Sequence, residues 1–552
     1  MYSKVLRVVC VTIVFALAAC SSKTVNQAPP KGGIASIDVK DLHDHMAFLA
    51  SDELQGRETG THSLDVAARY IATELAKMNL KPVGDHGTFL QHYTLQKQKI
   101  AKSSVLAIQK NGEKSEFAFG KQFVSMPSRS MESKTIEGEV VFAGYGIYAP
   151  DLEYDSYTGI GAKDKIVVIM GSEPKDANGK SIFDSTKSAS QYAQFPTKMQ
   201  AAMAAGARAM IYVPPPGPEG ERMTAQLKQM SGFFARPQFS LANASAPGRG
   251  GMNSSMLMMF AMAEVANAIL AGSGKTLAEL KSEIDAQKKP VPFKLENINA
   301  AIRLEIERGE TTVSNVMALL EGSDPQLKEE VVVYSAHYDH VGINDDGEIF
   351  NGADDDGSGT TALLEIAQAY AEKSERPKRS VLFLWVSGEE KGLLGSRYYS
   401  ENPIISMEQT IANINMDMVG RVRAADDTSK TNEMLALAKD VYVVGGHQSS
   451  DLKKINEQMA LQAGLRIDYT LNDLNHPQRI YYRSDHYNFA RKGVPVLFYT
   501  TGLHEDYHKA TDTAEKINFT KIKDIAKMAF LTGWKVANLE KRIVVDNKLE
   551  LR

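Results

Sequence analysis

Cysteine is scarce in this sequence. Only two of the 552 residues are cysteine, Cys10 and Cys20, and both lie within the first twenty positions. The chain beyond Cys20 can therefore form no internal disulfide and offers no thiolate to a metal ion. This excludes disulfide-stapled scaffolds and thiolate zinc sites for most of the protein.

Clusters of basic residues are also missing. Lysine and arginine number 63 against 67 aspartates and glutamates, and the formal net charge is −4. Nucleic-acid binding needs a basic patch or stripe, so we expect no nucleic-acid partner. The composition, 43% hydrophobic and 24% charged, is that of a globular protein. Its length exceeds what one compact core organises, so two or more domains are expected.

The N-terminus carries an apolar run, residues 8–18, that is too short for a permanent membrane span. Lys4 and Arg7 precede it, which is typical of a secretory signal peptide. The run leads into LAAC, which resembles a bacterial lipobox; the polar segment after Cys20 favours this over a plain signal peptide cleaved elsewhere. We predict a signal peptide at 1–19, a tether at 20–35, and a lipid on Cys20 that anchors the protein to a membrane of the cell envelope. Ser21 favours the outer membrane, facing the periplasm.

Strands and helices alternate from Val316 onward. The strand-length apolar runs are VVVYSA (331–336), SVLFLWVS (380–387), TIANINM (410–416) and VPVLFYT (494–500). Such runs between amphipathic helices predict an α/β fold with a mostly parallel sheet and helices on both faces. Residues 101–300 instead show short strands between Gly, Pro and Asp turns. We predict one domain from 36–100 and 301–552, and a smaller β-rich α/β domain inserted at 101–300.

Histidine, acidic residues or both follow each of the four predicted strands. In chain order they are His337, Asp339, Glu389, Glu390, Asp417, His504 and His508. Ligands bind beyond the carboxyl ends of the strands in open α/β sheets, so these side chains are expected to meet at one edge. Burying so much charge requires a counter-charge, which divalent cations supply.

The residue types indicate which cation. Imidazole with carboxylate and no thiolate suits zinc, for which manganese or cobalt can substitute, whereas calcium takes more oxygens and no histidine. The aspartates 354–356 in NGADDDGSG do not have EF-hand spacing. Of Glu389 and Glu390, one can bind metal while its neighbour acts as general base. Asp339 can accept a hydrogen bond from His337 and fix its tautomer.

Five motifs carry a family resemblance. SAHYDHVG, NGADDDGSG, VSGEEKGLLGS, NMDMVGR and YHKATDT resemble, in the same order, the motifs of the dizinc aminopeptidases of peptidase family M28. The likeness covers the chain from about Ser314 to the C-terminus. FAGYGIYAP and KMQAAMAAGARAMIYV resemble an inserted protease-associated (PA) domain. The resemblance implies the zinc exopeptidase fold, two zinc ions per chain and hydrolysis of N-terminal residues from peptides.

The resemblance also implies a metal-ligand set, which is His337, Asp354, Glu390, Asp417 and His508. Asp354 would bridge the two ions, and a non-proline cis peptide would link Asp354 to Asp355. One ion would take His337 and Asp417, the other Glu390 and His508. Asp356 would support only the turn and the start of the next helix.

The catalytic residues implied in the same way are Glu389 as general base, Asp339 as partner of His337, and Tyr481, with Tyr482 as fallback, at the oxyanion. His340, His486 and His504 are expected to be neighbouring residues, not ligands. Arg57 and Glu58 either line the mouth of the site or form a turn salt bridge. A carboxypeptidase or dipeptidase with the same site stays an alternative. A non-catalytic surface receptor is less favoured, because every ligand and the general base are present.

Overall fold

The structure is a computed structural model that describes residues 33–125, 132–242 and 256–549. The predicted signal peptide, Cys20 and nearly all of the predicted tether lie outside these residues. Within the described ranges, no helix combines the length and the apolar character needed to cross a membrane.

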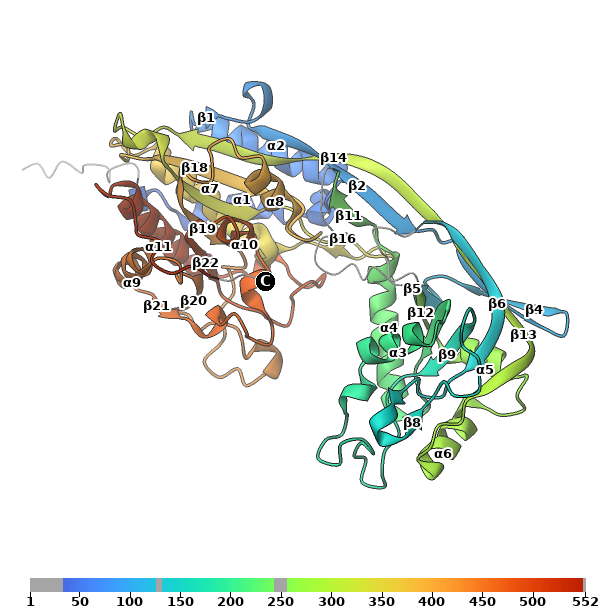
Figure 1. Cartoon of the computed structure of the whole chain (residues 1–552). Coiled ribbons are helices and arrows are strands. Elements are labelled where there is room, and N and C mark those ends of the chain that lie inside the picture. Colours follow the sequence, from blue (N-terminus) through green and yellow to red (C-terminus); the bar gives the residue numbers. More distant parts are fainter. Residues whose placement is uncertain (1–32, 126–131, 243–255, 550–552) are drawn as a thin grey trace, which may run out of the picture.

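The larger of two main sheets carries the predicted site (Figure 1). It has ten strands in the order β11-β2-β14-β18-β15-β19-β22-β20-β21, with β1 beside β14. The central strands β18 (Ser380–Val386), β15 (Val331–His337), β19 (Thr410–Met416) and β22 (Val496–Thr500) are parallel. The outer strands make the sheet mixed, because β14 pairs with β18, and β20 with β22, in antiparallel fashion. The predicted α/β class is confirmed.

The outer strands of this sheet are β1 (Lys81–Pro82), β2 (Leu90–Ile100), β11 (Gln238–Leu241), β14 (Ile306–Leu320), β20 (Asp440–Gly445) and β21 (Arg466–Asp468). Every residue of the four central strands is buried. Strands covered on both faces have no need for alternating polarity, which explains their continuous apolar runs.

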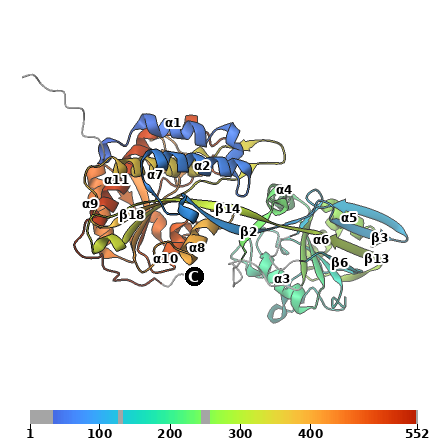
Figure 2. The same cartoon turned by 90° about the horizontal axis from the view of Figure 1, so that it is seen from above.

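Helices cover both faces of the larger sheet (Figure 2). One face packs against α1 (Val39–Leu49), α2 (His62–Lys77), α7 (Gly359–Ala371), α9 (Ser450–Ala463) and α11 (Phe519–Ala537). The other packs against α8 (Leu394–Glu401) and α10 (His486–Ala490), through Tyr399 and Phe489. Each helix buries an apolar stripe against the strands, which is how such a sheet excludes water.

The smaller sheet has eight strands in the order β4-β3-β13-β6-β9-β10-β12-β5. They are β3 (Val105–Lys110), β4 (Glu113–Ala118), β5 (Phe123–Ser125), β6 (Lys134–Phe142), β9 (Ile166–Met170), β10 (Ala209–Val213), β12 (Leu257–Ala261) and β13 (Phe293–Leu304). The accompanying helices are α3 (Phe195–Ala204), α4 (Pro218–Ala235), α5 (Ala263–Leu270) and α6 (Leu277–Gln287). A short hairpin, β7 (Tyr148–Ala149) with β8 (Tyr154–Asp155), lies between β6 and β9.

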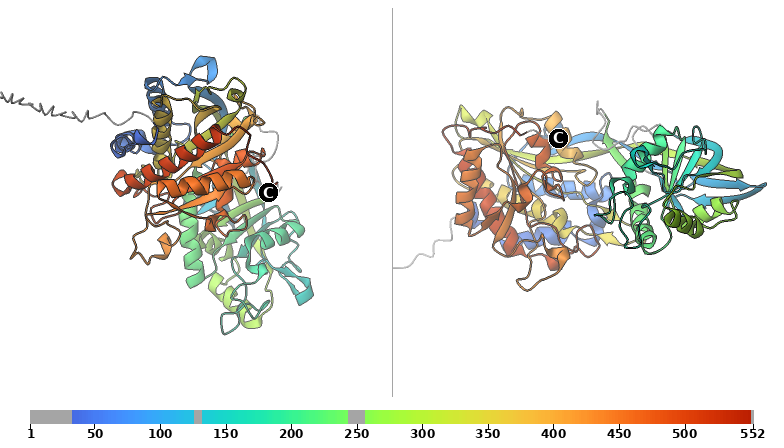
Figure 3. Two further views of the ribbon diagram at one scale, coloured as in Figure 1. Left: turned by 90° about the vertical axis from the view of Figure 1, so that its left-hand side faces the viewer. Right: turned by 60° about the horizontal axis from the view of Figure 1, so that its bottom comes forward.

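The chain passes between the two parts along β2 and β14, which pair side by side and extend from one body to the other (labelled in Figure 2; Figure 3 shows the two bodies from two further sides). The strands of the smaller sheet all fall within the predicted insertion or next to its end. One strand within the insertion behaves differently, since β11 pairs with β2 in the larger sheet. The insertion is therefore tied to the larger sheet at a second place.

Candidate metal centre

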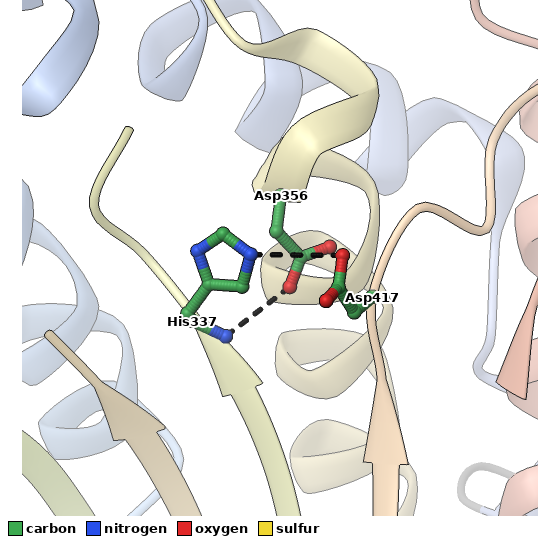
Figure 4. Close-up of side chains that lie close together, drawn as sticks. All are labelled: His337, Asp356 and Asp417. Carbon is green, nitrogen blue, oxygen red and sulfur yellow. Dashed lines mark hydrogen bonds and ion pairs between the residues drawn. The ribbon is translucent and has the colours of Figure 1, made fainter. Parts of the chain in front are cut away.

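The predicted histidines and carboxylates lie together at the carboxyl ends of the central strands. His337 is the last residue of β15, Asp417 directly follows β19, and His508 lies in the loop after β22. Glu389 and Glu390 follow β18. Figure 4 shows His337 and Asp417 side by side at this edge. Parallel strands end at the same edge, so four loops far apart in sequence meet there.

Asp355 is the carboxylate that lies between the two histidines. Its Oδ1 is 3.3 Å from Nε2 of His337, and its Oδ2 is 3.1 Å from Nε2 of His508. On one side, Oδ1 of Asp417 lies 3.6 Å from Nε2 of His337. On the other side, Oε2 of Glu390 lies 3.0 Å from Nε2 of His508. Asp355 thus faces two groups of potential ligands, one around His337 and one around His508.

This arrangement corrects the prediction for Asp354. Its Oδ2 pairs with Nε2 of His504 at 3.1 Å, and its Oδ1 accepts the Gly420 N–H at 2.6 Å. The cis peptide joins Asp355 to Asp356, not Asp354 to Asp355 as predicted. Three adjacent aspartates look equivalent in sequence, but the turn directs successive carboxylates to different partners. The carboxylate that faces both histidines is therefore that of Asp355, one residue after the predicted Asp354.

Asp356 supports the start of α7. Its carboxylate accepts N–H groups from His337 at 3.1 Å, Gly359 at 2.8 Å and Met418 at 3.2 Å. It also lies close enough to His337 and Asp417 to form a potential metal-binding group with them (Figure 4). Because three backbone donors already occupy its oxygens, Asp355 is the better ligand for an ion between the two histidines.

His340 contributes a donor beyond the expected ligand set. It is buried, and its Nδ1 lies 2.9 Å from Oε1 of Glu390 and 3.8 Å from Oδ2 of Asp355. The three residues form a second group whose ligand atoms lie within 4.8 Å of one another. The signal in the sequence is its place three residues after His337, in the same strand-end loop.

The ionisation of the site shows its demand for positive charge. Burial acts to lower the pKa of His508, but the carboxylates of Glu390 and Asp355 outweigh it and raise that pKa to about 10. Burial opposes the change at His337 too, yet Glu389 and Asp417 raise its pKa well above the usual value. Nε2 of each ring lacks a hydrogen-bond partner among the described residues, although carboxylate oxygens face it. Nitrogen and oxygen donors in this arrangement fit zinc.

The pKa values of the adjacent residues Glu389 and Glu390 are shifted in opposite directions. Burial, opposed by His337 and reinforced by the Glu390 carboxylate, raises the pKa of Glu389 well above its usual range. Burial and Asp355 act to raise the pKa of Glu390 as well, but His508 and His340 lower it to about 2. Environments that separate the pKa values of two neighbouring acids commonly mark an acid–base assignment. Glu390 is thus the carboxylate that stays anionic beside His508 and His340, and Glu389 is the one whose proton affinity burial increases.

Asp339 is placed differently from the prediction. Its Oδ1 is 3.8 Å from Nδ1 of His337, too far for a hydrogen bond, and the Asp339 carbonyl oxygen lies 3.1 Å from that nitrogen instead. The carboxylate accepts the Glu389 N–H at 3.1 Å and the Thr59 hydroxyl at 2.7 Å. Asp339 therefore orients His337 through its backbone and Glu389 through its side chain.

A small pocket of about 40 Å³ opens beside Asp355, Glu389 and Asp417. Apolar side chains form most of its remaining wall, namely Met418, Leu471, Ile480, Phe498 and Leu503. Arg483 and Tyr507 also line it, and the Arg483 guanidinium donates a hydrogen bond to the Tyr507 hydroxyl at 3.0 Å.

The structure does not bring Tyr481 to this pocket. Its side chain is fully buried, and its ring packs against His447 and His486. Tyr507, stacked on the ring of His508 at 3.9 Å, is the tyrosine that lines the pocket with Glu389. Its position immediately before a predicted metal ligand is the signal that could have identified it.

The N-terminal segment holds the loop that leads into the aspartates 354–356. Arg57 is buried and donates hydrogen bonds to the carbonyl oxygens of Leu49, Tyr338, Asn351 and Gly352. Asn351 and Gly352 lead into the aspartate run, so Arg57 holds that loop against the N-terminal segment instead of lining the mouth of the site. Glu58 forms no turn salt bridge with Arg57, because its carboxylate instead pairs at 2.8 Å with the ammonium of Lys391, which is distant in sequence.

Residues 315–532 match the family described as Peptidase family M28. The chain is 23% identical over 366 residues to a probable zinc metalloprotease of Pyrenophora tritici-repentis, covering 59% of this chain and 69% of that protein. It is 26% identical over 250 residues to a probable leucine aminopeptidase of Arthroderma benhamiae, covering 44% and 62% respectively. The chain thus spans less than two thirds of the second relative.

Solved structures share the fold over nearly the whole chain. An aminopeptidase from Aneurinibacillus sp. strain AM-1 superposes with a TM-score of 0.53 at 18% identity, covering 93% of this chain and 97% of that one. A zinc aminopeptidase from Bacillus subtilis gives a TM-score of 0.50 at 18% identity, covering 90% and 95%. The similarity extends through both sheets, so the two-part architecture is shared.

Proposed function

We propose that this chain, whose residues 315–532 belong to peptidase family M28, is a zinc-dependent aminopeptidase with a dinuclear metal site. The observation that carries the proposal is the Asp355 carboxylate, whose two oxygens face two different histidines. His337 and Asp417 would hold one ion, Glu390 and His508 the other, and Asp355 both. His340 is positioned to support the second ion through Glu390.

The bound ions would polarise the scissile carbonyl and make a water molecule nucleophilic at neutral pH. Glu389, beside the pocket, would accept the proton of the attacking water and deliver it to the leaving amine. Asp339 fixes the backbone of Glu389 for this task. The Tyr507 hydroxyl, oriented by Arg483, would donate a hydrogen bond to the developing oxyanion.

The small pocket supports cleavage at the amino end. Its walls would accommodate a single side chain on the N-terminal side of the scissile bond. A carboxypeptidase would need cations there, and Arg483, already bonded to Tyr507, is the one cationic side chain among the described lining residues. The apolar wall favours apolar N-terminal residues.

A chromophore assay tests this proposal. We expect hydrolysis of leucyl-p-nitroanilide, loss of activity with a chelator, and recovery on zinc addition. Glu389→Ala should lower kcat about 10²- to 10⁴-fold, the usual contribution of a general base. The zinc content of this variant should remain that of the wild type. Activity that resists chelation, an unaffected Glu389→Ala variant, or equal cleavage of N-acetylated substrates would refute the proposal.

The membrane anchor is a separate proposal that rests on the sequence. The polar segment after Cys20 supports lipidation of that residue and attachment of the peptidase to the envelope. Cys20→Ser should release the protein from the membrane fraction while leaving peptide hydrolysis intact. The assignment of 101–300 as an inserted PA domain likewise rests on its motifs and on the separate sheet that it forms.

A further inference from the structure

A second cavity reaches the metal centre at His508. This interdomain cleft, of about 1490 Å³, has His508 in its wall. One side is formed by α4 and the residues after it, from the smaller part of the molecule. The other side is formed by the hairpin of β16 (Gly342–Ile343) and β17 (Ile349–Phe350) and by residues 508–511. The cleft is several times larger than the small pocket.

The relative sizes decide which part of a peptide each cavity can hold. An aminopeptidase places one residue on the N-terminal side of the scissile bond and the whole remaining chain on the other side. The small pocket suits the single residue. The remaining chain must leave the metal centre through the larger opening, which begins at His508 and runs between the hairpin and α4.

Unpaired charge in the cleft is predominantly positive. Several lining charges are already neutralised, since Lys99 pairs with Glu307 at 2.9 Å and Lys102 with Asp345 at 3.6 Å. Glu58 is likewise paired with Lys391. Lys228 and Lys509 are exposed and have no carboxylate within 4.0 Å among the described residues.

Arg236 adds a third cation, for which the structure describes no carboxylate partner. Its described contact is a weak hydrogen bond, at 3.4 Å, to the carbonyl oxygen of Val341 across the cleft. Against these three cations stand two lining carboxylates without a cationic partner among the described residues, Asp346 and Glu348, the second of which accepts a hydrogen bond from the Asn344 amide at 2.7 Å. The wall formed by α4 and Lys509 therefore offers cations to a ligand, whereas the hairpin wall keeps the negative charges of Asp346 and Glu348.

We propose that the interdomain cleft binds the part of the substrate beyond the scissile bond, and that Lys228, Arg236 and Lys509 select peptides that carry a carboxylate there. The carboxylate comes either from the C-terminus of a short peptide or from an acidic side chain. This inference rests on the proposed aminopeptidase function. It assigns the inserted part of the chain a direct role in substrate choice, because two of the three cations belong to it.

Paired peptides test the inference. The substrates are Leu-Ala-Ala with a free C-terminus, its C-terminal amide, and Leu-Ala-Asp amide. For the wild type we expect kcat/KM for the free acid and for the Asp-containing amide to exceed that for the plain amide about three- to tenfold, as expected from a few solvent-exposed ion pairs. The preference should shrink in high salt, which screens such pairs. If the wild type prefers only the free acid or only the Asp-containing amide, the cleft recognises the C-terminal carboxylate or the acidic side chain, respectively.

Substitutions in the insert then locate the selectivity. Lys228→Gln with Arg236→Gln should reduce the free-acid preference to about twofold or less, and Arg236→Lys should retain most of it. Lys289→Gln, the same loss of charge at an exposed site outside the cleft lining, should keep the wild-type ratio.

Leucyl-p-nitroanilide has no peptide beyond the scissile bond and serves as the reference reaction. Equal wild-type rates on the free acid and the amide would overturn the inference, as would a double variant with an unchanged preference. A failure of the proposed function would appear separately, as a lack of chelator-sensitive hydrolysis of leucyl-p-nitroanilide by the wild type.

Discussion

The two sheets of this molecule share a run of parallel strands but differ in the residues that follow each strand. In the smaller sheet β6, β9, β10 and β12 are parallel neighbours, like the central strands of the larger one. There the strands lead into Ala143-Gly144, Gly171-Ser172 and Pro214-Pro215. In the larger sheet they lead into histidine and acid. Among the described residues, similar architecture thus brings together candidate metal ligands in the larger part alone, because chemistry resides in the strand-end residues.

Buried charge is handled differently as well. In the smaller part, the buried Glu173 accepts the Ser190 N–H at 2.6 Å, and the buried Lys198 donates to the Tyr145 carbonyl oxygen. These charged groups are satisfied by nearby protein groups. At the metal centre, imidazoles and carboxylates face one another with nitrogen atoms for which the described residues supply no hydrogen bond. A site that requires an external cation can be recognised by that difference.

The largest expected effect concerns the two aspartates at the metal centre. Asp355→Asn should weaken zinc binding by more than about 100-fold, since outer partners of ligands alone contribute about 10- to 100-fold. Asp354→Asn keeps an acceptor for Gly420 N–H and should weaken binding about tenfold or less. Competition with a chromophoric chelator measures both. A larger loss for Asp354→Asn would favour Asp354 as the bridging ligand and remove the basis for a bridging Asp355.

Much of this site could be predicted from sequence. Continuous apolar strands predict the parallel centre of the larger sheet, and the rule that ligands bind at strand ends is enough to group His337, Glu390, Asp417 and His508. Strand-end position is encoded locally, and the structure places those four side chains at one edge. What local patterning could not encode is the direction of each side chain within a turn.

The errors share that cause. Asp354 and Asp355 have the same chemistry and neighbouring positions, and only backbone geometry decides which carboxylate faces the histidines. Tyr481 and Tyr507 are both tyrosines near predicted site segments, and only the packing of their loops separates the core residue from the pocket residue. The buried hydrogen bonds of Arg57 depend on contacts nearly 300 residues apart, which no local pattern reveals.

A buried cation of the larger part should be important for stability. Arg57→Met removes the donor for four carbonyl oxygens at once and should lower the free energy of unfolding by about 3 kcal/mol, as expected when buried acceptors lose their partners. Urea unfolding of the metal-free protein measures this. Zinc affinity should fall as well, because the loop before Asp355 is released. Arg376→Met, at an exposed position, is the matched control. Equal stability of the two variants would show that Arg57 does not anchor the loop.

Replacing a buried cation of the smaller part should increase the free energy of unfolding, by an amount that depends on pH. Burial, partly offset by Glu173, lowers the pKa of Lys198 from 10.5 to about 7. At pH values between these two pKa values, the unfolded chain binds more protons than the folded chain. The free energy of unfolding of the wild type should therefore increase with pH in this range. The increase is at most about 1.4 kcal/mol per pH unit for one group. Lys198→Met has no charge to desolvate and should be the more stable protein near pH 7.

Because only the wild type gains from this lysine as the pH rises, the stability difference should narrow towards about pH 10. Urea unfolding of both proteins at several pH values measures it, with Lys289→Met as the exposed control. Parallel stability profiles for wild type and Lys198→Met would mean that Lys198 keeps its charge in the folded state. The smaller part would then hold an uncompensated buried cation. Its contrast with the metal centre, where unsatisfied charge marks the functional site, would no longer hold.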